Sequence, residues 1–349
     1  MIVGVSRAPE RAPFMVNNAE KGGIMKSVRK LLAVVSVLVV GVSAAGPLAA
    51  SDYPAQPVTV IVAFTPGGTT DMLTRMVSTR LTEKLGKTFV VENKPGAGGN
   101  IGTEYVVKAK PDGYTLMVNS VGPIAVNPTL YKNLPYNPIT DLEPVVQIAD
   151  VPNVLVVPAG ANTPNLKALI EKGKAKKGGL SYCSTGVGTS SHLSGFMLAQ
   201  ASNVTAVHIP YTGADALHDL LAGRNDFMFA TIPSVMAHIQ SGRLLPIAVS
   251  SARRSRSLPN TPTMIESGYP GFEAGSWFGF LAPRGTPRPI IDTLNRAVNE
   301  IIKDPKIDEQ MVFAGADPVG GPPEQFKAFI DKEFKKWQIV VKESGATAQ

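Results

Sequence analysis

Apolar and polar positions along the chain form two patterns: short continuous apolar runs, and segments whose apolar residues recur at helical spacing. The first run, Val58–Phe64, is rich in β-branched residues, as in a strand buried on both faces of a parallel sheet. It ends at Pro66-Gly67-Gly68, and a helical pattern follows over Asp71–Leu85. Thr69 and Thr70 offer hydroxyl groups for the N-cap of this helix. The pattern therefore predicts a strand, a glycine turn and a helix that begins at the turn.

The same order of strand, glycine turn and helix occurs twice more. Residues 95–102 separate the apolar run Thr88–Asn93 from the helical segment Ile101–Lys110. Residues 184–189 separate Leu180–Cys183 from Ser190–Ala201. At such a turn the first backbone N–H groups of the helix and the positive end of its dipole point at one place, which suits an anion. Three such turns in one chain favour the hypothesis that they converge on one small acidic molecule.

The rest of the chain continues the alternation of strands and helices. Further strands are predicted over Thr115–Asn119, Leu142–Ala149, Asn153–Val157, Ala206–Ile209, Asp226–Ala230, Leu244–Ser250 and Trp277–Ala282. Further helices are predicted over Leu166–Lys174, Asp215–Ala222, Val235–Ser241, Ile290–Lys303 and from Pro322 or Pro323 through Trp337. This alternation predicts an α/β protein with parallel sheets and helices on both faces. Ligands of such proteins bind at the carboxyl ends of the strands, where all three glycine turns fall.

The first 50 residues have the features of a secretory signal peptide rather than of a folded domain. The basic segment Met25–Lys30 precedes the apolar run Leu31–Val42, which is too short to span a bilayer as an anchor. Small residues follow the run, as at a cleavage site. Met25 stands where a signal peptide would start, which indicates that residues 1–24 precede the true start. We therefore expect a protein exported to the periplasm.

Charge and cysteine content narrow the function further. Residues 1–50 contain six of the 34 basic and two of the 27 acidic residues, which leaves 28 basic and 25 acidic residues and a net charge of +3. This charge is too small to indicate binding to nucleic acid. Cys183 is the only cysteine, so no internal disulfide can form, which agrees with a periplasmic protein. A thiol nucleophile paired with His192 is an alternative role for Cys183, but a small buried residue is the favoured one.

Motifs for catalysis do not assemble. Gly96, Gly98 and Gly102 have the spacing G-x-G-x-x-x-G, which differs from the dinucleotide-binding fingerprint. The segment 118–122 lacks the first glycine of a nucleophile elbow. The four histidines have no metal-ligand spacing to one another or to the cysteine. We therefore expect no enzymatic activity, no cofactor and no metal.

Short motifs along the whole chain after residue 50 resemble those of one family. They are Phe64–Asp71, Glu92–Gly99 with Gly102, Lys110–Leu116, Gly186–Ser190 with His192 and Leu193, Pro210–Gly213, Pro262 and Thr263 with Glu266–Gly268, and Trp277 with Ala282–Pro287. In this order and spacing the chain resembles the extracytoplasmic solute receptors of the tripartite tricarboxylate transporter family, the TctC or Bug receptors.

The resemblance implies a two-lobed periplasmic binding protein fold, type II-like, in which crossover hinge segments join two α/β lobes around a ligand cleft. Lobe 1 would comprise residues 51–150 and 276–349, and lobe 2 residues 151–275. The first crossover is expected at Asp150-Val151-Pro152 and the second between Ser250 and Trp277. Trp277 and Trp337 are expected to serve packing. The receptor is expected to be a monomer.

The resemblance also implies binding of a small carboxylate, such as a di- or tricarboxylate, an acidic amino acid or an aromatic acid. The expected ligand-binding residues are Phe64, Gly67, Gly68, Thr69, Thr70, Asn119 and Ser120 from lobe 1, and Ser184, Thr185, Thr189, Ser190, His192 and Thr231 from lobe 2. For His192, capping or packing within its own helix is the alternative. Asp71 is expected to interact with the helix dipole instead, because its carboxylate would repel an acid.

The expected partners are this solute and the membrane subunits of a tripartite tricarboxylate transporter, to which the receptor delivers it. The alternative is an orphan solute sensor of the same fold that reports to a signalling protein.

Overall fold

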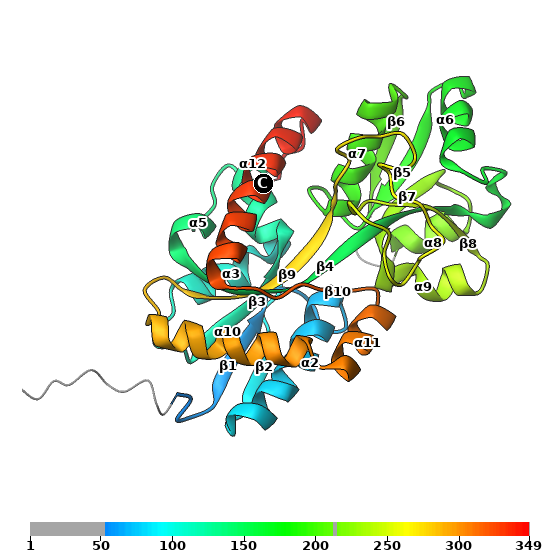
Figure 1. The fold of residues 1–349 in the computed structure, drawn as a ribbon. Helices are drawn as coiled ribbons and strands as arrows, with labels where there is room; N and C mark the ends of the chain where they lie inside the picture. Colours follow the sequence, from blue (N-terminus) through cyan, green and yellow to red (C-terminus); the bar gives the residue numbers. More distant parts are fainter. Residues whose placement is uncertain (1–52, 212–214, 349) are drawn as a thin grey trace, which may run out of the picture. The chain divides into compact units, whose positions relative to one another are not determined.

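The computed structural model describes residues 53–211 and 215–348 (Figure 1). The predicted signal peptide, residues 1–50, lies outside the described residues. In the part of the chain that is described, no helix combines the length and the apolar character needed to cross a membrane.

Ten strands of the described residues form one mixed sheet. Its order is β2-β1-β3-β9-β4-β7-β5-β6, and β8 and β10 also pair with β4. The strands are β1 (Val58–Val62), β2 (Phe89–Asn93), β3 (Thr115–Ser120), β4 (Leu142–Pro158), β5 (Leu180–Ser184), β6 (Ala206–Pro210), β7 (Phe227–Thr231), β8 (Leu244–Val249), β9 (Gly275–Pro283) and β10 (Asp317–Pro318).

Helices follow most of the strands, as the sequence pattern predicts. They are α2 (Thr69–Leu85), α3 (Asn100–Val107), α4 (Asn127–Leu130), α5 (Pro138–Asp141), α6 (Leu166–Ala175), α7 (Ser190–Ser202), α8 (Asp215–Leu221), α9 (Ile232–Gln240), α10 (Arg288–Ile302), α11 (Pro305–Phe313) and α12 (Pro323–Ser344), with the single turns η2 (Ala97–Gly99), η3 (Gly122–Val126) and η4 (Ala159–Ala161). The sequence analysis missed α11, although Asp304 accepts hydrogen bonds from the N–H groups of Lys306 and Ile307 as an N-cap before Pro305.

The longest strand, β4, replaces two strands of the sequence prediction. β4 pairs with β9 from Leu142 to Pro152, and with β7 and β8 from Asn153 onward. The chain stays extended through Asp150, Val151 and Pro152 because all three still pair with β9. Pro152 stands where the pairing with β9 ends, so its missing N–H group costs little there. The predicted break between two strands is therefore wrong.

The sheet is parallel only in its two outer parts. β2, β1 and β3 pair in parallel, and so do β6, β5 and β7, whereas every pairing of β4 and β9 is antiparallel. The prediction of parallel sheets is wrong for the middle of the sheet. There the chain leaves the first parallel group along β4 and returns along β9 (Figure 1). Two parallel groups joined by these strands form a two-lobed α/β fold. The exact lobe boundaries remain predictions.

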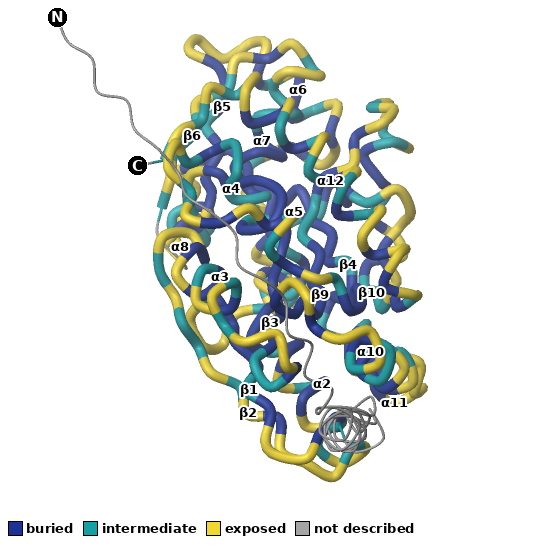
Figure 2. The backbone as a smooth tube through the Cα atoms, turned by 90° about the vertical axis from the view of Figure 1, so that its left-hand side faces the viewer, coloured by how far each residue is buried: buried dark blue, intermediate teal, exposed yellow. Residues whose placement is uncertain are grey.

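The core lies on both faces of this sheet. Figure 2 shows β3, β9 and β4 as mostly buried, with exposed positions on the outer helices and turns. On one face α10 contributes Ile291, Leu294 and Val298, which follow helical spacing and pack in the same core cluster as residues of β1 and β3. The rigid strands thus fix the turns at their ends.

Candidate functional site

The first glycine turn joins β1 to α2. Gly68 is the N-cap residue of α2, Thr69 and Thr70 are the first two helical residues, and no side chain caps the helix. The prediction that Thr69 or Thr70 supplies an N-cap hydroxyl is therefore wrong. Instead, the Asp71 carboxylate accepts a hydrogen bond from the Gly67 N–H group over 2.9 Å and closes the turn from within the helix. Gly67 and Gly68 are exposed.

Asp71 is fully engaged within the protein. Its carboxylate also accepts hydrogen bonds from Arg75 Nε at 3.0 Å and from Asn93 Nδ2 at 2.9 Å. Burial of Asp71 opposes ionisation, but the hydrogen bonds from Arg75, Gly67 and Asn93 outweigh it and lower the pKa to about 2. Asp71 thus has the structural role expected from the sequence.

Replacing Asp71 by alanine is expected to lower the free energy of unfolding by about 2 kcal/mol, because three donors lose their acceptor. Arg75, the partner of Asp71, offers a control because its side chain is 49% exposed. Arg75→Ala is expected to lower the free energy of unfolding by less than about 1 kcal/mol. Urea unfolding at pH 7 measures both. Because the Asp71 pKa is lowered, its contribution is present above the unfolded-state pKa and is lost as the pH falls from 3.8 through about 2. Equal losses in the two variants would contradict this role.

The second glycine turn packs against the first. A β-carbon on Gly99 would lie 3.2 Å from Phe64 Cζ and 2.6 Å from Pro123 Cγ. Phe64 itself is partly buried. The Gly98 carbonyl accepts a hydrogen bond from Asn127 Nδ2 at 3.0 Å. The second turn therefore contacts both Phe64, beside the first turn, and the segment that follows β3, residues 121–131, which we call the central segment.

Asn119 and Ser120 end β3 beside these turns. Asn119 is fully buried, its Nδ2 donates to Thr103 Oγ1 at 2.8 Å, and its Oδ1 accepts from the Ser120 N–H group at 2.9 Å. These bonds tie β3 to α3. The Asn119 side chain therefore has a supporting role inside the protein. The Ser120 side chain, at the end of the same strand, is also buried.

The third glycine turn, which we call the lobe-2 turn, comprises residues 184–189. Thr189 caps α7, because its Oγ1 accepts from the His192 N–H group at 3.3 Å and donates to the Gly186 carbonyl at 2.8 Å. Ser184 is fully buried, and its Oγ lies 3.0 Å from the same carbonyl. Thr185 is exposed, and Ser190 Oγ lies 3.5 Å from an oxygen of Asn153. Of these hydroxyls, Thr185 has the freest access to solvent.

Two stacked imidazole rings support the lobe-2 turn. The rings of His192 and His208 lie 3.8 Å apart at 17°. His192 Nδ1 accepts from the Gly188 N–H group at 3.1 Å, and His208 Nε2 lies 2.6 Å from Ser184 Oγ. Burial lowers the pKa of both rings to about 4, and for His192 the charge of His208 adds to this effect. The sequence analysis assigned no role to His208. The pairing of β6 with β5, which places His208 beside Tyr182, shows its role.

The lobe-2 turn and the second turn meet at the central segment. Gly188 packs so closely on Leu130 of α4 that no side chain fits between them. Tyr131, the next residue, lies against Gly98 of the second turn. Thr231 ends β7 opposite Asn153 of β4, whose side-chain oxygen lies 3.5 Å from Ser190 Oγ, and its own hydroxyl lies 3.1 Å from Ser234 Oγ in the first turn of α9.

Cys183 occupies the opposite face of β5 from Tyr182 and Ser184. The thiol is fully buried, its Sγ lies 3.4 Å from the Ala216 carbonyl, and burial raises its pKa to about 12. A small buried residue is therefore the role that the geometry favours. Within residues 53–211 and 215–348, no group of three or more His, Cys, Asp or Glu side chains is arranged to hold a metal.

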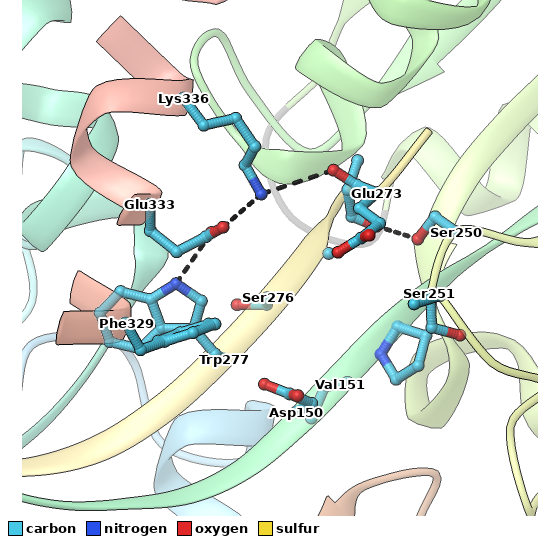
Figure 3. Close-up of a pocket in the computed structure, with 14 residues that line it drawn as sticks. Asp150, Val151, Ser250, Ser251, Glu273, Ser276, Trp277, Phe329, Glu333 and Lys336 are labelled. Atoms are coloured by element: carbon cyan, nitrogen blue, oxygen red, sulfur yellow. Dashed lines mark hydrogen bonds and ion pairs between the residues drawn. The ribbon is translucent and has the colours of Figure 1, made fainter. Parts of the chain in front are cut away.

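A cavity of about 140 Å³ lies away from these turns, where β4 and β9 run from one parallel group of strands to the other. None of the thirteen predicted ligand-binding residues lines it. Figure 3 shows Glu333 of α12 at its wall, where the carboxylate accepts from Trp277 Nε1 at 3.2 Å and contacts Lys336. Trp337 Nε1 donates to the same carboxylate at 2.8 Å. The two indoles are buried, as expected, but they also form a polar network that the sequence analysis did not predict.

Comparison with known proteins agrees with this architecture. The profile described as "Tripartite tricarboxylate transporter family receptor" matches residues 73–346. Protein BugT of Bordetella pertussis is 39% identical over 319 residues, 91% of this chain and 98% of BugT. The structure of R. palustris Rpa4515 with adipate is 36% identical, with a TM-score of 0.78 over 84% of this chain and 99% of that one.

A second solved structure extends the comparison. MatC from Rhodopseudomonas palustris with bound malate is 29% identical, with a TM-score of 0.73 over 83% of this chain and 100% of that one. The sequence resemblance, the two-lobed fold and these matches agree, and the chain belongs to the tripartite tricarboxylate transporter family of solute-binding receptors.

Proposed function

We propose that this receptor captures a small carboxylate in the periplasm and delivers it to the membrane subunits of a tripartite tricarboxylate transporter. The observation that carries the proposal is that the second and third glycine-rich turns pack on the central segment, residues 121–131, while Phe64 beside the first turn lies against Gly99 of the second. Export through residues 1–50 and the lobe boundaries given above are parts of the same proposal.

Backbone groups can bind a carboxylate at these turns without a dedicated arginine. No side chain caps the first backbone N–H groups of α2, Thr189 caps the His192 N–H group in the first turn of α7, and both helices direct the positive ends of their dipoles at their turns. The Thr185 hydroxyl is exposed and free to reach solvent, and water can bridge the remaining distances. Phe64 offers an apolar wall to a short carbon chain. The ligands of two relatives, adipate and malate, are both dicarboxylates, which supports this substrate class.

Calorimetry against malate, adipate, citrate, aspartate and benzoate tests the proposal. At least one acid is expected to bind with a dissociation constant near or below about 1 μM, or about −8 kcal/mol. An uncharged diol of similar length is expected to give no heat. Absence of binding across all the acids would contradict a carboxylate receptor.

A matched pair of glycine variants tests the location of the site. Gly188 and Gly223 both have left-handed backbones, with φ of +76° and +71°, but only Gly188 packs against a neighbour, Leu130. Gly188→Ala therefore displaces the lobe-2 turn and is expected to weaken binding at least about tenfold, since even 1.4 kcal/mol has that effect. Gly223→Ala is expected to bind like the parent protein. Equal affinities would place the ligand elsewhere.

Uptake of the bound acid by a strain that lacks the gene distinguishes delivery from sensing. Loss of uptake, restored by the gene on a plasmid, supports delivery to a transporter. Unchanged uptake would overturn the delivery role and leave a sensor of the same fold.

A further inference from the structure

Two histidines bind opposite ends of the lobe-2 turn. His208 on β6 approaches Ser184 Oγ to 2.6 Å at the start of the turn. His192 on α7 accepts the Gly188 N–H group at 3.1 Å near its end. The two imidazole rings stack on each other at 3.8 Å. The two stacked rings thus fix the turn from β6 at one end and from α7 at the other.

The hydrogen-bond pattern around the turn assigns the protons of this pair. His192 Nδ1 must carry a lone pair, because it accepts from a backbone N–H group. Ser184 Oγ lies 3.0 Å from the Gly186 carbonyl, to which it donates, and 3.2 Å from the Gly186 N–H group, from which it accepts. Its remaining lone pair then accepts from His208 Nε2–H. Both rings fit this network as neutral imidazoles.

Among the described residues that face the two rings, no negatively charged group would stabilise an added proton. The titratable groups that face the rings are the Tyr182 phenol from β5, with its ring 5.0 Å from that of His208, and each imidazole itself. Beyond Tyr182 lies Phe227 of β7, which is uncharged. Among the described residues no carboxylate shifts the titration of either ring, whose pKa is lowered by burial and, for His192, by the charge of His208. Protonation of His192 at Nδ1 would also place two N–H donors face to face.

We propose that His192 and His208 are positioning residues for the lobe-2 turn, and that the contact of His192 Nδ1 with the Gly188 N–H group holds the turn in its binding geometry only while both rings are neutral, so that acidification releases the turn and the acid bound there. The proposal rests on the proposed function for the identity of the ligand. The behaviour of the turn does not depend on the proposed function.

Nuclear magnetic resonance of the mature chain tests the turn without any ligand. The Gly186 and Gly188 amide signals are expected to change together with the imidazole signals of His192 and His208 between pH 7.5 and pH 4. In His192→Asn, whose side-chain oxygen can accept from the Gly188 N–H group but does not titrate, the Gly188 response is expected to disappear. His218→Gln is the matched control, because His218 is highly exposed on α8. Glycine amides that ignore the imidazole titration would overturn the proposal.

Binding of adipate at pH 7.5 and pH 4 tests the consequence for the ligand. His192→Leu is expected to bind about tenfold more weakly than the parent at pH 7.5, the effect of one lost buried hydrogen bond. His192→Asn is expected to recover most of this loss and to weaken less than the parent at pH 4. The protonation of adipate itself is common to all variants and cancels in their ratio. Parallel pH profiles of the parent and His192→Asn would overturn the proposal.

The two experiments separate the two claims. If adipate and the other acids do not bind the parent protein, the proposed function fails, while the glycine amide titration still decides the role of the histidines. If His192→Leu does not fold, the parent protein and His192→Asn decide it alone.

Discussion

Replacing Asp150 by asparagine is expected to stabilise the protein at pH 8 and to leave its stability nearly unchanged at pH 4. Asp150 lines the cavity between β4 and β9 (Figure 3). Burial raises its pKa to about 7, and the negative charges of Glu333 and Asp317 add to this effect. Among the described residues, the side-chain donor to its carboxyl group is Gln147 Nε2, at 2.5 Å. An ionised Asp150 is therefore costly.

The sign of the effect follows from proton binding. Between pH 3.8 and about 7 the folded protein keeps a proton on Asp150 that the unfolded chain has released. The stability due to this proton is complete below the unfolded-state pKa and is lost as the pH rises through about 7. A rise of the Asp150 pKa from 3.8 to about 7 corresponds to about 4 kcal/mol. Asparagine keeps the shape and avoids the charge, so the variant lacks this loss.

Urea unfolding of the parent protein and Asp150→Asn from pH 4 to pH 8 measures the difference. It is expected to grow by about 4 kcal/mol across this range. The matched control is Asp331→Asn, which removes an exposed ion pair with Lys327 and is expected to change stability by less than about 1 kcal/mol at any pH. A difference between Asp150→Asn and the parent that does not vary with pH would exclude a buried charge at Asp150.

Glu333→Ala is expected to destabilise the protein by about 3–5 kcal/mol at pH 7, because it leaves buried polar groups without their partner. The Glu333 carboxylate is the shared acceptor of the Trp277 and Trp337 indole N–H groups and pairs with Lys336. Both indoles are buried, so water cannot easily replace the lost acceptor. The network ties α12 to β9, which links the two parallel groups of the sheet.

The control for this variant is Glu324→Ala at the start of the same helix. Glu324 pairs with Arg288, but its side chain is 62% exposed, and its loss is expected to cost less than about 1 kcal/mol. Glu333→Gln keeps an acceptor for the indoles and is expected to lie between the two alanine variants. Urea unfolding at pH 7 ranks all three. A loss in Glu333→Ala no greater than in Glu324→Ala would show that the network does not stabilise the fold.

Local patterns determined much of the fold. Continuous β-branched runs marked β1 and β2, and glycine turns followed by helical periodicity marked the starts of α2 and α7. These signals are local, because a buried strand or an amphipathic helix needs apolar residues at a fixed spacing. The order and spacing of the turn motifs was also sufficient to identify the family, which the family profile and the relatives confirm.

Long-range neighbours could not be derived in this way. β4 reads as two strands in sequence because Asp150 and Pro152 interrupt the apolar run, and only its pairing with β9 keeps it extended. Likewise, the hydrogen bonds of the Asp71 carboxylate include one from Asn93, which lies far away in sequence at the end of β2.

By itself, the sequence determined the fold class, the family and the three glycine turns, since each depends on residues close together in the chain. The tertiary structure alone decided which groups share a proton or a hydrogen bond. It set His208 of β6 against Ser184 of β5, and it brought Glu333 of α12 to Trp277 of β9. Burial and the pairing of distant strands fix such contacts, and neither is encoded in the spacing of nearby residues.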